Sequence, residues 1–140
     1  MSIERSIKQF CPELESAGFN ISALVEMMDT RYMGEFEIFL AASALFLDCY
    51  KEQLNDVKQA IESMDRKKIH DCAHKFKGAI GNFHDANVAE MARLIEVNSD
   101  SWTQEQFVIQ FHKLNSDVTK FVSQLNQLVA GFSKIQTQAA

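Results

Sequence analysis

Apolar side chains recur every three or four residues along most of this 140-residue chain. That spacing places them on one face of an α-helix. Only one proline and five glycines are present, so few positions would interrupt a helix. The sequence shows no sustained strand-like alternation and no internal repeat. We therefore expect an all-α protein.

Four long amphipathic segments account for most of this pattern. The first covers about residues 33–64, and the second follows a capping Asp65 and extends to about Phe83. The sequences Asn87-Val-Ala-Glu90 and Thr103-Gln-Glu-Gln106 both resemble capping boxes, which predicts that they open the third and fourth helices. Short connections between such helices predict an antiparallel up-down four-helix bundle.

Shorter amphipathic stretches, Ile3 to Phe10 and Ile21 to Met28, add one or more short helices at the N-terminus. No linker composition divides the chain, so we predict a single helical domain over residues 1–140. Within it, 1–20 is an N-terminal extension, 21–132 the bundle and 133–140 a frayed tail.

Bulk properties limit the classes of function. The net charge of -5 argues against general binding of nucleic acid. No apolar run approaches the length of a membrane span, and charges occupy the N-terminal positions where a signal peptide would be apolar. Three widely spaced cysteines suit a reducing compartment better than a disulfide framework. We expect a cytoplasmic protein with no membrane or nucleic-acid partner, and a monomer by default.

The most informative segment is Ala73-His-Lys-Phe-Lys-Gly-Ala-Ile-Gly-Asn-Phe83. Helical spacing divides its side chains between a buried stripe and a second stripe that faces water. The buried stripe contains Ala73, Phe76, Ile80 and Phe83. The stripe facing water contains His74, Lys77, Gly78 and Gly81.

Two glycines in a helix interior require an explanation, because each costs about 1 kcal/mol relative to alanine. Neither Gly78 nor Gly81 falls at the end of the predicted helix, where glycine would serve as a cap. Their lack of side chains would let another protein approach His74 closely. Tight helix packing is the alternative, but the shared stripe with His74 and Lys77 favours access.

The residue types then suggest the chemistry. An exposed, neutral imidazole has a lone pair that can attack phosphorus, and Lys77 can neutralise phosphoryl oxygens during transfer. No Walker-type loop, acid-base pair or metal cluster accompanies them, so a partner must supply the aspartate and the metal ion.

Basic residues also gather around His74 and suit an acidic partner site; they are Arg66, Lys67, Lys68, Lys75 and Lys77. For Arg66 to Lys68, a solvated first helical turn is an equal alternative.

The sequence from Ala73 to Ala79 closely resembles the phosphorylation-site signature of histidine phosphotransfer (HPt) domains, and the resemblance extends from about Ile21 to Leu128. It implies that His74 is phosphorylated, usually at Nε2. It also implies that receiver domains dock over Lys77, Gly78 and Gly81. The resemblance predicts a phosphocarrier without kinase activity that relays a phosphoryl group between receiver aspartates.

The implied partners are response-regulator receiver domains and a hybrid sensor histidine kinase. No cofactor of the chain itself is expected, and Mg²⁺ is expected on the receiver. The chain departs from many members at His84, where they have a glycine.

Three further residues complete the predicted site. We extend the receiver-docking surface to His70 and Lys67, which precede His74 on the helix. If the turn between antiparallel helices centres near Asp85, His74 and Glu96 each lie eleven residues from it and meet at one height. Glu96 would then accept from Nδ1–H of His74, as a glutamate does in some relatives of the chemotaxis-kinase type. An exposed helix carboxylate is the equal alternative.

Two other classes of function compete. His70 and His74 have the i, i+4 spacing of zinc-binding histidines, but an aspartate stands where the zinc motif has glutamate, and no third ligand follows at a characteristic spacing. Lys67 and Lys77 would also repel a cation, so no metal is predicted. The other alternative is a helical adaptor that only binds partners, with His74 a surface histidine by chance.

Overall fold

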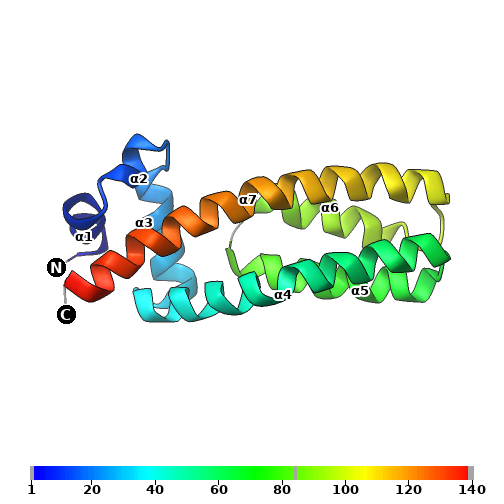
Figure 1. Cartoon of the computed structure of the whole chain (residues 1–140), viewed down its shortest axis with the longest axis horizontal. Coiled ribbons are helices and arrows are strands. Elements are labelled where there is room, and N and C mark those ends of the chain that lie inside the picture. Colours follow the sequence, from blue (N-terminus) through cyan, green and yellow to red (C-terminus); the bar gives the residue numbers. More distant parts are fainter. Residues whose placement is uncertain (1, 84, 139–140) are drawn as a thin grey trace. The chain divides into compact units, whose positions relative to one another are not determined.

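The computed structural model describes residues 2–83 and 85–138 (Figure 1). Every regular element among these residues is helical, which confirms the all-α class. None of their helices is long and apolar enough to span a membrane. The α-helices are α1 (Ile3–Phe10), α2 (Glu13–Ser16), α3 (Ile21–Tyr32), α4 (Phe36–Ser63), α5 (Arg66–Ile80), α6 (Ala86–Val97) and α7 (Gln104–Gln138), with a 3₁₀ turn, η1 (Gly81–Phe83), after α5.

The chain separates into two compact units. Residues 46–122 form one unit, and the described residues before 46 and after 122 form the other. α4 and α7 are long, and each contributes one stretch to each of the two units.

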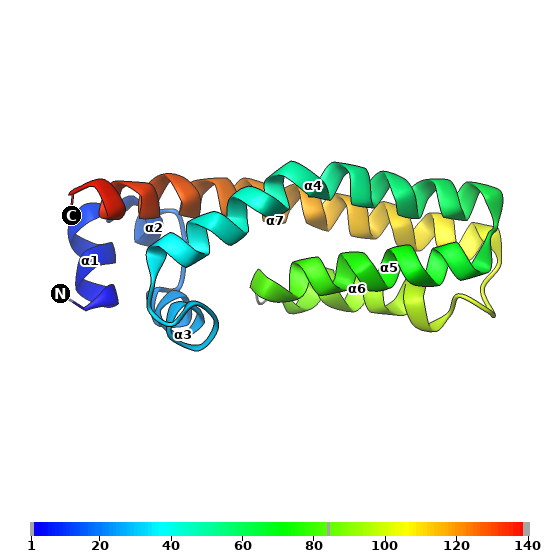
Figure 2. The same cartoon turned by 90° about the horizontal axis from the view of Figure 1, so that it is seen from below.

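The unit of residues 46–122 is an antiparallel four-helix bundle. Its parts of α4 and α7 lie side by side in one layer, and α5 and α6 form the other layer (Figure 2). Phe46 of α4 lies at the centre of an aromatic cluster, with its ring centroid 5.3 Å from Phe83 and 5.5 Å from Phe121. Phe76 also joins this cluster, 6.3 Å from Phe46. The residues predicted to form the buried stripe, Ala73, Phe76, Ile80 and Phe83, are all buried. The residues predicted to face water lie on another face of α5.

The second unit is built around the end of α7. A Cβ atom added to Gly131 would come within 3.2 Å of Cys11 Cβ, so this glycine permits close approach to the N-terminal segment. Residues 133–138, part of the predicted frayed tail, are instead helical. Ile135 is buried, and Lys134 forms an ion pair with Glu13. Burial of an apolar side chain and pairing of a charge hold this segment in the fold; residues 139 and 140 lie outside the described residues.

Two of the three predicted helix caps are confirmed. Asp65 accepts from the backbone N–H of Lys68, and Thr103 and Gln106 bond reciprocally to each other's backbone N–H, as in a capping box. The predicted cap at Asn87 is wrong. Asp85 caps α6 instead, through Oδ1 to the N–H of Val88, because α6 begins at Ala86.

The ends of α4 and α5 also differ from expectation. α4 begins at Phe36 rather than near 33, because Met33 and Gly34 have left-handed φ angles of 52° and 72°. α5 ends at Ile80, and η1 continues to Phe83. Gly81 is therefore the C-cap of α5, contrary to the expectation that it lies inside the helix. Its φ of -58° is one that any residue adopts, so the backbone does not require glycine here.

The position of the α6 cap yields a stability prediction. Asp85→Ala should lower the free energy of unfolding by about 1 kcal/mol, because the N–H of Val88 loses its acceptor. Asn87→Ala, at an exposed position two residues on, should change it by less than about 0.5 kcal/mol. Urea denaturation of the two variants measures the difference, and equal losses would contradict the assignment of the cap.

Candidate functional site

The candidate site lies where α5 and α6 pack against each other in the bundle (Figure 2). His74 projects from α5 with 64 % of its side chain exposed, while its neighbour Ala73 is buried in the core. The helical spacing therefore places the imidazole on the surface, as predicted. Asp85 caps α6 in the short connection between the two helices, and α6 runs antiparallel to α5. Glu96 on α6 therefore lies beside His74 on α5.

The Glu96 carboxylate contacts two side chains of α5 that can carry a positive charge. Its Oε1 lies 3.0 Å from Nδ1 of His74, and its Oε2 lies 2.8 Å from Nζ of Lys77. Only 12 % of the Glu96 side chain is exposed. Of the two readings of Glu96, the structure thus places the carboxylate against His74 rather than in open solvent. The contact with Lys77 was not foreseen, although a carboxylate that reaches His74 also reaches the residue one turn on.

Opposing effects set the charge of this carboxyl group. Burial alone would raise the pKa of Glu96, but Lys77 and His74 lower it more, and the pKa lies below its ordinary value. At neutral pH the group is therefore an ionised carboxylate, which can only accept hydrogen bonds. The proton between Oε1 and His74 must therefore belong to Nδ1, and in the neutral ring the free lone pair is on Nε2.

His70 belongs to the same cluster of side chains. Its ring is parallel to that of His74, with 6.2 Å between centroids, and its Nε2 lies 3.9 Å from Oε1 of Glu96. Its Nδ1 lies 3.1 Å from a carboxylate oxygen of Asp71. Within residues 2–83 and 85–138, no three His, Cys, Asp or Glu side chains are grouped as a metal would require.

Open space surrounds both glycines beside His74. A Cβ atom added to Gly78 or to Gly81 would meet no heavy atom within 4 Å outside its own stretch of helix. By contrast, Gly131 is in tight contact, so the chain contains both kinds of glycine. Close helix packing therefore does not explain Gly78 and Gly81, and the access interpretation fits the geometry.

The basic residues near His74 divide into two groups. The guanidinium of Arg66 donates to the carbonyl oxygens of Ser99 and Trp102, at 2.9 and 3.0 Å. Arg66 therefore ties the start of α5 to the connection between α6 and α7, a structural role within the bundle. Lys67, Lys68 and Lys75 are exposed, and Lys67 remains part of the predicted docking surface. His84 lies outside the described residues.

A scan against protein-family models matches residues 42–132 to the Hpt domain. The match covers most of the chain and includes His74, Lys77 and Glu96, so the protein belongs to the Hpt domain family. It is thus a phosphotransfer module of two-component signalling. The match begins within α4, later than the resemblance drawn from Ile21. Searches of curated proteins and of solved structures found no match to this chain.

The contact between Glu96 and His74 predicts a tautomer. In the wild-type protein the neutral His74 ring should carry its proton on Nδ1. In Glu96→Gln the fraction of neutral His74 rings with the proton on Nδ1 should fall, because an amide can donate or accept and does not select one tautomer. Long-range proton–nitrogen NMR of the imidazoles measures both states. His112, exposed on α7, is the internal control, and unchanged His74 signals in the variant would contradict the geometry.

Proposed function

We propose that this protein relays a phosphoryl group between aspartates of receiver domains through a phosphohistidine at His74. The single observation that carries the proposal is the contact of a largely buried, ionised Glu96 with Nδ1 of an exposed histidine. An adaptor that only binds partners has no need of an oriented imidazole. The open surface at Gly78 and Gly81 beside the ring also favours transfer.

The proposed transfer step balances without an external acid or base. The Nε2 lone pair of His74 attacks the phosphorus of a receiver aspartyl phosphate and forms an N–P bond. The P–O bond to the aspartate breaks, and that carboxylate leaves with the electron pair. The ring then carries a positive charge with its proton still on Nδ1, and the Glu96 carboxylate compensates that charge. Attack by the aspartate of a second receiver reverses the step.

Lys77 is proposed to stabilise the phosphoryl oxygens during transfer. In the unphosphorylated protein its ammonium is paired with Glu96, so it is held one helical turn from the reacting nitrogen. Its side chain is 32 % exposed and can reach charge that develops beside His74. Glu96 thus positions both the nucleophile and the cation.

The proposed docking surface for a receiver consists of Gly78, Gly81, His70 and Lys67. The glycines admit the partner's backbone, and Lys67 adds positive charge opposite an acidic active site. The receiver would supply Mg²⁺ and the aspartate, and a hybrid sensor histidine kinase would supply the phosphoryl group at the start of the relay. We place this activity in the cytoplasm, in a monomer without kinase activity of its own.

Phosphate mapping tests the assignment of the acceptor. His74→Gln should abolish acceptance from phosphorylated receiver domains, with the free energy of unfolding changed by less than about 0.5 kcal/mol, because the side chain is largely exposed. His112→Gln changes an exposed histidine on α7 outside the proposed docking surface, so this control variant should still accept phosphate. Acid-labile phosphate on His74→Gln, or acceptance lost only together with folding, would contradict the assignment.

The glycine surface predicts opposite effects on stability and transfer. Gly78→Ala should raise the free energy of unfolding by up to about 1 kcal/mol, because the position is helical and a Cβ meets no neighbour. Gly78→Gln should fold at least as well as wild type, yet slow transfer from a phosphorylated receiver by obstructing its approach. Thermal melts and transfer rates on the same samples measure both effects. A destabilised Gly78→Ala, or full transfer by Gly78→Gln, would refute the access role.

A further inference from the structure

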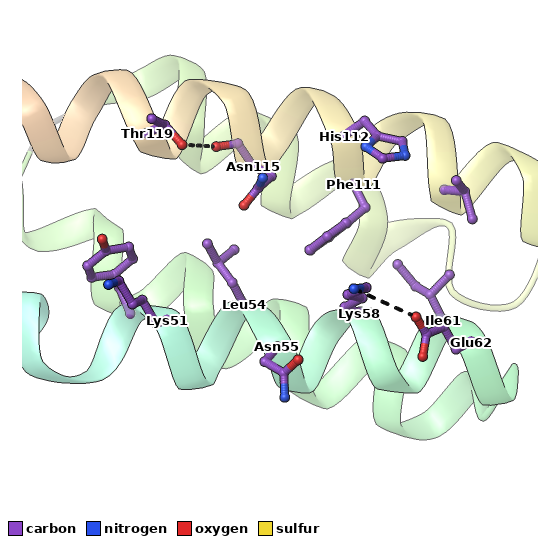
Figure 3. Close-up of a pocket in the computed structure, with 12 residues that line it drawn as sticks. Lys51, Leu54, Asn55, Lys58, Ile61, Glu62, Phe111, His112, Asn115 and Thr119 are labelled. Atoms are coloured by element: carbon purple, nitrogen blue, oxygen red, sulfur yellow. Dashed lines mark hydrogen bonds and ion pairs between the residues drawn. The ribbon is translucent and has the colours of Figure 1, made fainter.

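A second concave surface lies on the other layer of the bundle, away from the residues of the candidate site. It is a groove of about 600 Å³ between α4 and α7, within the unit of residues 46–122. Leu54, Ile61 and Phe111 point into the space between the two helices (Figure 3). Leu54 and Ile61 are buried, so they form an apolar floor, and Val108, which also lines the groove, is 39 % exposed.

The dimensions of the groove favour a narrow ligand. Its lining runs from Tyr50 to Glu62 on α4 and from Val108 to Thr119 on α7. At the rise of an α-helix, each stretch is about 17 Å long. The volume lies within the range of small-molecule sites, roughly 300–1,000 Å³, and is too small for a docked helix of that length. A long, narrow space with an apolar floor suits an extended alkyl chain.

The charges along the rim favour an anionic head group. Two lysines and a histidine line the groove against one acid, although the chain as a whole has a net charge of -5. Lys58 lies 4.0 Å from that acid, Glu62, so these two charges largely cancel. Among the described residues, Lys51 has no carboxylate within 4.0 Å. Figure 3 shows Lys51 at one end of the groove and Ile61 at the other.

We propose that this groove binds a long-chain carboxylate, with its alkyl chain along Leu54, Phe111 and Ile61 and its carboxylate at Lys51. The apolar floor removes the chain from water, and the unpaired ammonium supplies the charge that selects an acid over a cationic amphiphile. None of the residues that line this groove belongs to the candidate site around His74, so the proposal does not rest on the proposed phosphoryl transfer.

Calorimetric titration of the full chain with dodecanoate below its micelle concentration tests the proposal. Binding should be saturable and equimolar, and dodecyltrimethylammonium should bind more weakly. Lys51→Glu should weaken dodecanoate binding by at least about fivefold, since reversal removes an attraction and adds a repulsion. Lys120→Glu makes the same change in net charge at an exposed residue outside the groove lining, and should alter the affinity by less than about twofold.

A second pair of variants tests the path of the alkyl chain. Val108→Glu places a charge on the groove wall and should weaken binding by a similar factor. Ile109→Glu is the matched control, because Ile109 is an exposed apolar neighbour on α7 that does not line the groove. Circular dichroism confirms that each variant folds. Equal effects within either pair, equal affinity for the cationic amphiphile, or binding only to anionic phospholipid vesicles would overturn the proposal.

Discussion

The contact between the Glu96 carboxylate and the His74 imidazole is the interaction on which the rest of the site depends. It joins α5 to α6 at one height and fixes which ring nitrogen carries the proton. The same carboxylate is paired with Lys77, so the imidazole and the ammonium share one anion. Burial makes this arrangement costly for an isolated carboxylate, and only the two partners keep its pKa low. The site is therefore a coupled unit rather than a histidine with independent neighbours.

Much of this arrangement could be predicted from the sequence, because helical periodicity determines which side chains share a face. The buried positions of Ala73 and Phe76 and the exposure of His74 followed from spacing alone. Counting eleven residues on each side of Asp85 also brought Glu96 to the height of His74. That count works because antiparallel helices with a short connection advance at the same rate per residue.

Other features depend on contacts that no local pattern encodes. Asn87 and Asp85 both lie near the start of α6, and only the path of the connection decides that Asp85 is the cap. Arg66 was grouped with the neighbouring lysines, yet its partners are carbonyl oxygens about thirty-five residues away along the chain. The helical end of α7 likewise rests on contacts with the N-terminal segment, including the ion pair of Lys134 with Glu13. Polar residues near helix ends have several local partners available, so sequence alone does not choose among them.

The two glycines near the end of α5 also have a dynamic consequence. On their face of the helix the backbone at Gly78 and Gly81 is not covered by side chains, although Ile80 and Phe83 are buried on the other face. After Ile80, η1 replaces regular α-helical hydrogen bonds. We therefore expect local opening of this last turn to require less free energy than opening of the start of the helix, which Asp65 caps and Arg66 ties to the connection between α6 and α7. Amide hydrogens in the last turn should exchange with solvent sooner than those near Ile69. A segment that opens readily can adjust its backbone to receivers of different surface shape, while the imidazole, held from α6, keeps its orientation.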